Sequence, residues 1–227
     1  MKLIFENKKQ IVDNVWTFEF RSSEPNTWTA GQYIHIDLPH NQPDEKGTSL
    51  YFTISSAPFE NVIQITTRIT DSSFKQSLSQ LSKGAELTLL EKPKGDFIWY
   101  DSDRPIIFIA GGIGVTPFYS IIKQRVFDGL PLKITFIYVN RNNDVPFKEV
   151  FDQWAANDST FIINYQIGSP LSVEYLVAKC PDINSSFVYL SGPESMVETI
   201  GANLQKNGLP KSQLKQDYFP NYSENNY

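Results

Sequence analysis

The segment from residue 106 to residue 117, IIFIAGGIGVTP, constrains the fold of this chain more than any other. An apolar run, which predicts a buried strand, passes into three glycines. Thr116 is then expected to cap a helix, and Pro117 fits the first position of that helix. Glycines let a bulky group approach the backbone, and the free amides of a helix N-terminus attract negative charge. The segment therefore predicts a turn that binds a phosphate group, as in dinucleotide-binding domains.

The spacing of the glycines departs from the usual G-x-G-x-x-G, because Pro117 stands where the third glycine would be. Glycines that only permit a tight turn are the alternative interpretation. The strand before the turn and the helix after it favour the dinucleotide. We expect five residues of this segment to bind the cofactor: Gly111, Gly112, Gly114, Thr116 and Pro117.

The pattern of apolar residues changes near residue 104. Before it, apolar and polar residues alternate, as in 16–20 and 63–69, which is typical of antiparallel strands. After it, continuous apolar runs are separated by helical segments, which indicates a parallel sheet covered on both faces. We expect a six-stranded type of antiparallel β-barrel over residues 1–102 and a Rossmann-like α/β domain over residues 103–227. The second domain should have strands at 106–110, 134–139, 161–165 and 187–190 and helices at 117–127, 147–156 and 194–206, and the barrel one helix at 73–81.

Composition excludes several classes of protein. A net charge of −5 and a pI near 5.1 give no general attraction to nucleic acid or to an anionic membrane. A single cysteine, Cys180, excludes an intrachain disulfide and a protein-bound iron–sulfur cluster. Only His35 and His40 offer imidazole, and we expect no metal site. The N-terminus lacks a signal-peptide pattern and the longest apolar run is interrupted by glycine and proline, so a reducing cytoplasmic compartment is expected.

Six short motifs follow one another in an order that resembles the ferredoxin–NADP reductase superfamily. They are GQY at 31–33, YFTISSAP at 51–58, GDF at 95–97, AGGIGVTP at 110–117, SGP at 191–193 and DYF at 217–219. The resemblance spans nearly the whole chain. It implies FAD on the barrel, NADPH or NADH on the α/β domain, and hydride transfer where the two cofactors meet.

The same resemblance implies which barrel residues would bind FAD. In the family pattern Arg-x-Tyr-Ser/Thr, the aromatic ring packs along the flavin and the hydroxyl approaches its N5 atom. Carried over, Phe52 would contact the flavin and Thr53 would be catalytic beside N5, with Tyr51 and Ile54 flanking them. The alternative is an ordinary strand with a core phenylalanine.

Leu50 departs from the family pattern, because it stands where the family has arginine. A charged hydrogen bond contributes about 1.5–3 kcal/mol, so its loss weakens FAD binding roughly ten- to hundredfold unless another cation replaces it. Lys46 and Arg68 are the candidate replacements. We therefore expect FAD to be held weakly and lost during purification.

A second anion site is expected where a strand ends and the barrel helix begins. Thr67 and Arg68 end the strand, and Ser72 or Ser73 caps the helix, whose free amides would bind the flavin phosphates as in the family. A plain helix cap is the alternative.

Four further positions are implied in the second half and the C-terminal tail. Many family members have cysteine near the nicotinamide where this chain has Ser191, which we expect to be catalytic, with Gly192 and Pro193 binding the cofactor. Phe219 is expected to cover the flavin, and packing of a terminal strand is the alternative.

The choice between NADH and NADPH stays open at this point. It normally depends on the end of the second strand, near residues 140–144. Arg141 is suited to a 2′-phosphate, whereas Asp144 is a carboxylate of the kind that holds a ribose 2′-hydroxyl.

Together these patterns predict a flavin-dependent NAD(P)H oxidoreductase that passes electrons to a separate redox protein, a small molecule or a membrane redox component at which it docks. One alternative is a free-flavin or ferric reductase that uses flavin as a substrate, which Leu50 favours. The other is a non-catalytic flavin- or nucleotide-binding module, which Leu50 and Ser191 together suggest.

Overall fold

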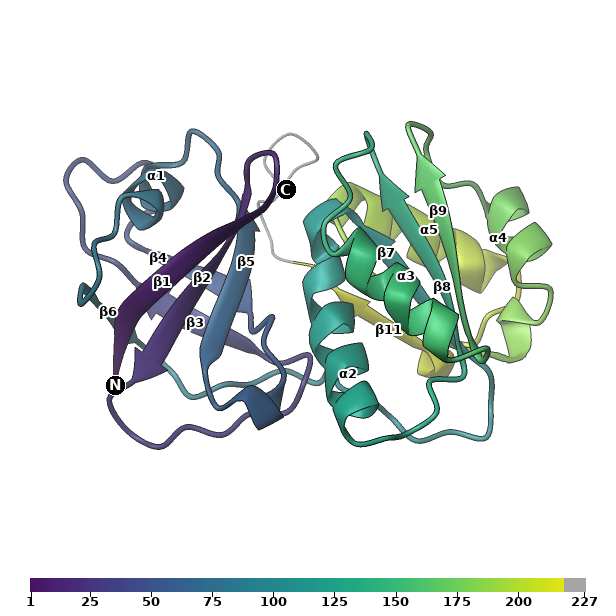
Figure 1. The fold of residues 1–227 in the computed structure, drawn as a ribbon. Helices are drawn as coiled ribbons and strands as arrows, with labels where there is room; N and C mark the ends of the chain where they lie inside the picture. The colour runs from purple at the N-terminus through teal and green to yellow at the C-terminus, as the bar shows by residue number, and fades with distance from the viewer. Residues whose placement is uncertain (219–227) are drawn as a thin grey trace.

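The computed structural model describes residues 1–218, which form one sheet in each half of the chain (Figure 1). The first sheet is antiparallel and contains β1 (Lys2–Val12), β2 (Val15–Ser22), β3 (Tyr33–Asp37), β4 (Ser49–Thr53), β5 (Ile63–Arg68) and β6 (Glu86–Leu89). Its strand order is β4-β3-β6-β1-β2-β5. The two ends of this order meet at a bridge between Ile54 and Ile65, beside which the Ser55 amide donates to the Gln64 carbonyl at 2.8 Å. The sheet therefore closes, and the predicted six-stranded barrel is confirmed.

Along the barrel strands, alternating apolar side chains point into the barrel interior and fill it. Phe18 and Phe20 of β2 and Ile63 and Ile65 of β5 are buried at 0–2% exposure, whereas the residues between them face outward or the other half of the chain. Burial of one such side chain contributes about 1.5–3 kcal/mol. The short helix α1 (Ser73–Ser79) covers this core with the buried ring of Phe74.

The second sheet is parallel throughout. It contains β7 (Ile106–Gly111), β8 (Ile134–Asn140), β9 (Phe161–Ile167), β10 (Phe187–Ser191) and β11 (Leu214–Asp217) in the order β11-β10-β7-β8-β9. The helices α2 (Thr116–Phe127) and α3 (Lys148–Asn157) cover one face, and α4 (Val173–Lys179) and α5 (Glu194–Lys206) cover the other. The expected Rossmann-like arrangement is confirmed (Figure 1).

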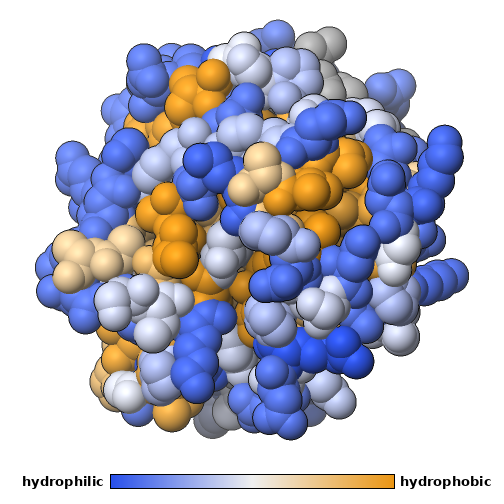
Figure 2. Space-filling model, turned by 90° about the vertical axis from the view of Figure 1, so that its right-hand side faces the viewer, coloured by the Kyte–Doolittle hydropathy of each residue, from blue (hydrophilic) through white to orange (hydrophobic). Residues whose placement is uncertain are grey.

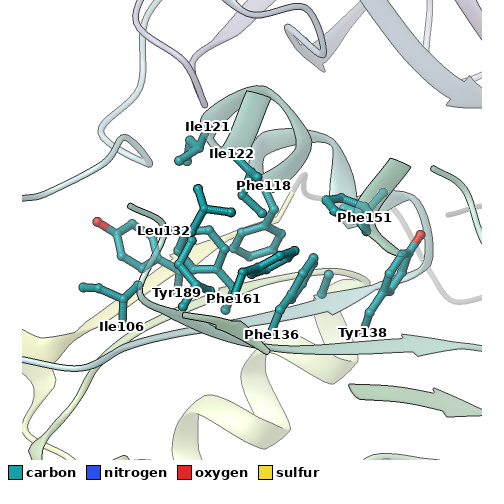
Figure 3. Close-up of a cluster of buried hydrophobic side chains, with 14 of the residues drawn as sticks. Ile106, Phe118, Ile121, Ile122, Leu132, Phe136, Tyr138, Phe151, Phe161 and Tyr189 are labelled. Atoms are coloured by element: carbon teal, nitrogen blue, oxygen red, sulfur yellow. The ribbon is translucent and has the colours of Figure 1, made fainter. Parts of the chain in front are cut away.

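An aromatic core lies between this sheet and the helices α2 and α3 (Figure 3). Phe118 of α2 packs on Phe108 of β7 with ring centroids 4.6 Å apart, and Phe136 of β8 contacts Phe151 of α3 edge to face at 5.3 Å. On β7, the side chains that alternate with Phe108 face α4 and α5 instead. Burial on both faces explains why these strands are continuous apolar runs.

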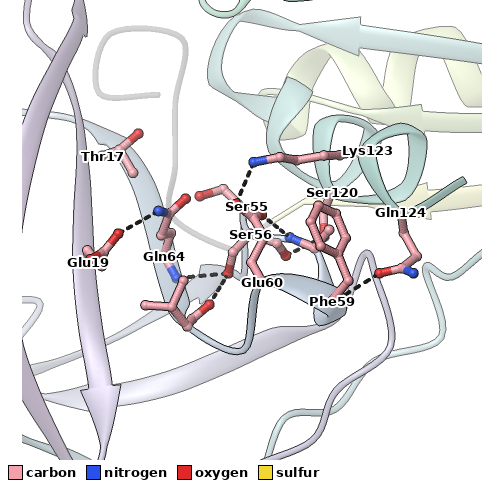
Figure 4. A network of polar contacts seen from close by, with 12 residues as sticks. Thr17, Glu19, Ser55, Ser56, Phe59, Glu60, Gln64, Ser120, Lys123 and Gln124 are labelled. Carbon is pink, nitrogen blue, oxygen red and sulfur yellow. Dashed lines mark hydrogen bonds and ion pairs between the residues drawn. The ribbon is translucent and has the colours of Figure 1, made fainter. Parts of the chain in front are cut away.

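A polar network joins the two halves of the chain (Figure 4). The Lys123 ammonium of α2 lies 2.6 Å from the Glu60 carboxylate of the barrel half, and the Ser120 hydroxyl donates to the Ser56 carbonyl at 2.7 Å. Phe97, which precedes β7, also packs edge to face on Phe118 of α2, with ring centroids 5.4 Å apart. The helix α2 is thus held against the barrel by polar and apolar contacts at once.

The side of the α/β half that lies away from the barrel includes β9 and α4, and it faces the viewer in Figure 2. Its apolar side chains lie in separate patches among hydrophilic ones, and Ile162 and Val177 are exposed. No helix within residues 1–218 is long and apolar enough to cross a membrane. Over the same residues, no group of three or more His, Cys, Asp or Glu side chains is placed to hold a metal ion.

Candidate active site

A cavity of about 590 Å³ opens at the carboxyl end of the parallel sheet. Ligands of open α/β sheets bind at this edge, because the loops that follow parallel strands converge there. The α/β half lines the cavity with Gly111, Gly112, Val139, Asn140, Arg141, Asn142, Pro170, Leu171, Pro193, Ser195, Met196, Thr199 and Ile200. The barrel adds Asp13, Asn14 and Arg68. The cavity therefore lies where the two halves of the chain meet.

The glycines of the turn after β7 have different reasons to be glycine. Gly112 has a φ of +53°, and a Cβ added to it would meet no atom within 4 Å, so its backbone is open. A Cβ on Gly111 would lie 2.5 Å from the Met196 sulfur, and one on Gly114 would lie 2.7 Å from the Gly192 backbone. Gly112 therefore fits a phosphate cradle, whereas Gly114 is required by its packing against the Gly192 backbone, and Gly111 lies against the Met196 side chain.

The helix after the turn begins differently from the expectation. A 3₁₀ turn, Gly112–Val115, precedes α2, and Thr116 donates its hydroxyl to the Ile113 carbonyl at 3.2 Å. The expected cap by Thr116 is therefore wrong, because its oxygen points back into the preceding turn. Thr116 and Pro117 are buried and do not line the cavity.

Ser191, at the end of β10, lies next to Asp217 of β11 in the strand register. The Ser191 hydroxyl is fully buried and makes no hydrogen bond of good geometry within the described part of the chain. Burial, reinforced by the charge of Asp96, raises the pKa of Asp217 to about 7, and the nearby Ser191 hydroxyl offsets part of this rise. Asp217 belongs to the DYF motif, but nothing in the sequence predicts its pairing with Ser191.

The strand β4 places its aromatic residues on opposite faces. Phe52 is 5% exposed and packs against Phe74 of α1 with ring centroids 5.7 Å apart, and Leu50 and Thr53 are buried as well. Tyr51 is 37% exposed and stacks on His35 at 4.0 Å. Contact of Phe52 and Thr53 with a flavin stays a prediction. The burial of Leu50 gives a physical reason for its apolar character, since a charged side chain there would enter the barrel core.

The start of α1 already contains a carboxylate. The Ser73 amide donates to the Asp44 carboxylate at 2.8 Å, and the Asp44 amide donates to the Ser73 hydroxyl at 2.9 Å. A phosphate bound to the Ser73 amide would have to displace Asp44. The Ser72 hydroxyl, by contrast, is buried without a hydrogen bond of good geometry among residues 1–218. Asp44 was missed because its loop, residues 39–47, reads as an ordinary polar connection.

Three cations come together beside α1. Lys75 is only 2% exposed, and its burial, together with the charges of Lys46 and Arg68, lowers its pKa to about 7. Lys46 and Arg68 are the two candidate replacements for the missing arginine. Lys75 was not expected, although its position three residues before Leu78 places both on the buried face of α1.

The structure brings only part of the predicted site to the cavity. Arg68, Gly111, Gly112, Arg141 and Pro193 line it, whereas Gly114, Thr116, Pro117, Ser191 and Gly192 lie beneath it or beside it. Tyr51, Phe52, Thr53, Ile54, Thr67, Ser72 and Ser73 belong to the barrel away from the cavity lining. Phe219 lies outside the described residues.

Comparisons with known proteins agree with this architecture. A family model described as the oxidoreductase NAD-binding domain matches residues 108–201. Flavohemoprotein A of Dictyostelium discoideum is 23% identical over 96% of this chain and 60% of its own length. The electron transfer component of toluate 1,2-dioxygenase from Pseudomonas putida is 22% identical over 94% of this chain and 66% of its own. The chain thus spans less than two thirds of these curated relatives.

Solved structures share the whole two-part fold. The flavohem-like FAD/NAD-binding domain of nitric oxide dioxygenase from Vibrio cholerae superposes with a TM-score of 0.80 at 18% identity, over 96% of this chain and 98% of that one. A ferredoxin NADP⁺ reductase from Neisseria gonorrhoeae, determined with bound FAD and NADP, gives 0.79 at 14% identity, over 96% and 97%. The chain thus shares the two-part fold of ferredoxin NADP⁺ reductases and flavohemoprotein FAD/NAD-binding domains, and its second half matches the oxidoreductase NAD-binding domain.

Proposed function

We propose that this chain is an FAD-dependent NAD(P)H oxidoreductase. The observation that carries the proposal is the cavity at the junction of the two halves, in which the open backbone of Gly112 faces the same space as Arg68 of the barrel. A dinucleotide bound at this edge of the sheet would lie against the barrel that, in the proposal, holds FAD. The superfamily relatives support this assignment.

The residues present fit both cofactors. The buried hydroxyls of Ser72 and Ser191 have no hydrogen bond of good geometry among the described residues, and both stand where the family pattern places a cofactor group. Lys75, Lys46 and Arg68 would supply the positive charge that a flavin pyrophosphate needs. Bound FAD and nicotinamide supply the hydride and electron chemistry.

The other residues position the cofactors. Gly112 would let the dinucleotide phosphates approach the turn after β7, and Pro193 and Met196 would form the floor of the cavity. Thr53 and Ser191 are the proposed catalytic residues, each through a hydroxyl that binds a reacting ring. We propose a domain boundary between residues 102 and 103, in the connection between β6 and β7.

The electron acceptor is a separate redox protein or a small molecule, and a cytoplasmic location is part of the proposal. The buried, apolar Leu50 favours one second candidate, a reductase that releases flavin as a product rather than retaining it. The two candidates share the same dinucleotide site and differ in how tightly the barrel holds flavin.

One experiment separates these functions. Purified protein is mixed with FAD under nitrogen, and NADPH or NADH is added while the flavin absorbance near 450 nm is followed. We expect rapid loss of absorbance with at least one nucleotide, and turnover of excess free FMN would identify the flavin reductase. Unchanged absorbance with both nucleotides would contradict the proposal and favour a non-catalytic binding module.

A further inference from the structure

The loop after β8 forms one wall of the cavity, and its conformation is fixed from inside. Asn140 is 5% exposed, and its side-chain amide donates to the carbonyls of Asn142 at 2.8 Å and Asp144 at 3.1 Å. A third hydrogen bond lies within the loop, where the Asn142 side-chain amide donates to the Asp144 carboxylate at 3.0 Å. The side chains at this strand end are therefore presented in a defined arrangement.

This arrangement holds the exposed acidic residue of the loop against a neighbouring amide, outside the lining of the cavity. The Asp144 carboxylate accepts the amide of Asn142, and the Asp144 backbone amide donates to the Asn142 side chain at 3.1 Å. Asp144 is not among the residues that line the cavity, whereas Asn140, Arg141 and Asn142 are. A carboxylate at this strand end would hold a ribose 2′-hydroxyl, and an arginine would accept a 2′-phosphate. The loop presents the arginine.

The opposite wall has groups that complement an adenosine phosphate. Two hydroxyls of α5, those of Ser195 and Thr199, line the cavity, and the side chains of Leu171 and Ile200 give it apolar surface suited to a purine ring. A guanidinium binds a phosphate dianion with two parallel hydrogen bonds, and hydroxyls add neutral donors.

The carboxylate that does line the cavity, that of Asp13, belongs to the barrel. It lies in the β1–β2 turn, next to the register pair of Val15 with Arg68, and it accepts the side-chain amide of Asn14 at 3.1 Å. It is therefore placed beside Arg68 of β5 and not in the loop after β8.

We propose that this chain selects NADPH over NADH, and that Arg141 binds the 2′-phosphate. The inference rests on the proposed function, because it concerns the electron donor of the same cavity. It assigns the specificity that the sequence left open between Arg141 and Asp144.

Steady-state kinetics with each nucleotide test the assignment. The wild-type protein, loaded with FAD, is expected to have a higher kcat/KM for NADPH than for NADH. Arg141→Gln should lower kcat/KM for NADPH about ten- to hundredfold and leave that for NADH within about twofold. Arg104→Gln is the matched control, because Arg104 donates to the Ser185 carbonyl at the opposite edge of the sheet. Equal or better use of NADH by the wild-type protein would overturn the assignment.

Calorimetric binding of adenosine fragments gives a readout without flavin or turnover. Adenosine 2′,5′-bisphosphate should bind the wild-type protein at least tenfold more tightly than adenosine 5′-monophosphate, and Arg141→Gln should abolish the difference. Equal affinities in the wild-type protein would contradict the specificity. Failure of both NADPH and NADH to reduce the flavin would instead contradict the proposed function, and the fragments would still decide the preference.

Discussion

Lys75 places cofactor binding and stability in conflict at a single residue. Its pKa falls from 10.5 to about 7 on folding, so the unfolded chain binds more protons between these values and stability rises with pH across that window. Lys75→Met should therefore stabilise the FAD-free protein at pH 7 by about 1 kcal/mol or more. The same change should weaken FAD binding about tenfold, because it removes a cation from the proposed pyrophosphate site.

Denaturant unfolding at pH 7 and pH 10, together with FAD titration by fluorescence, checks both effects of Lys75→Met. The exposed Lys92 provides the control, since Lys92→Met should change neither quantity. Unaltered FAD affinity in Lys75→Met would remove Lys75 from the proposed flavin site.

Asp217 gives stability the opposite dependence on pH from that given by Lys75. Its folded pKa of about 7 lies above the ordinary value of 3.8, so the folded chain binds more protons between these values. The contribution of Asp217 to the free energy of unfolding is therefore most favourable at low pH and is lost as the pH rises through 7. Asp217→Asn should unfold at higher urea concentration than the wild-type protein at pH 8 and show a smaller difference at pH 5. The exposed Asp103→Asn is the comparison, and a parallel pH profile for Asp217→Asn and the wild-type protein would refute the raised pKa.

The residues that sequence reasoning missed share a physical cause. Asp44, Lys75 and Asp217 acquire their roles from burial or from partners brought close by the fold, as in the contact of Asp44 with Ser73, 29 positions away. Propensity and spacing describe local structure, whereas these roles depend on which loop reaches which helix. By contrast, Gly112 and Arg68 both line the cavity, because a strand end fixes the position of each, and their binding of cofactors stays a prediction.

At the scale of elements, the sequence predicts the bounds of a helix or strand well where its apolar pattern continues over many residues. The helix α5 spans Glu194–Lys206 as expected from its helical spacing, and the continuous strands β7, β8, β9 and β10 begin where predicted. The strand β1 was not predicted, since its middle and end carry exposed polar residues. The helix α4 was missed because it is short and buries only Leu176. Marginal elements of this kind are specified by packing rather than by period.

The turn after β7 allows a test with a matched control. Gly112 and Gly129 both have positive φ, +53° and +67°, and a Cβ on either would meet nothing within 4 Å. Alanine at either position should therefore cost a similar amount, about 1 kcal/mol, from backbone strain alone. Only Gly112→Ala adds a methyl group to the cavity wall, so only this variant should bind NADPH more weakly, about tenfold.

Thermal unfolding and calorimetric NADPH binding measure the two glycine variants side by side. A third variant, Gly114→Ala, should be clearly less stable than both, because its Cβ would lie 2.7 Å from the Gly192 backbone. If Gly112→Ala and Gly129→Ala bound NADPH equally well, the phosphate cradle at Gly112 would be wrong.

For the whole molecule, the proposed chemistry depends on how the two halves are held together. The barrel and the α/β half each contribute residues to one cavity, so their relative position sets the geometry between the cofactors. Lys123 and Glu60 contribute to that position across the junction, and both side chains are largely buried, at 23% and 18% exposure. The Ser120 hydroxyl and the stacked rings of Phe59 and Phe127, 3.9 Å apart, add to the same contact.

Lys123→Met tests this dependence, because it removes the ion pair while keeping an apolar stem of similar length. The free energy of unfolding should fall by about 1 kcal/mol, whereas the affinities for FAD and NADPH should each stay unchanged. Stopped-flow reduction of the flavin should be about tenfold slower, since small displacements between reacting groups have large effects on rate. Lys148→Met removes the exposed pair with Asp152 on α3, at 47% and 43% exposure, and should leave that rate unaltered. An unchanged reduction rate in Lys123→Met, at lowered stability, would mean that this ion pair holds the fold together without setting the distance between the cofactors.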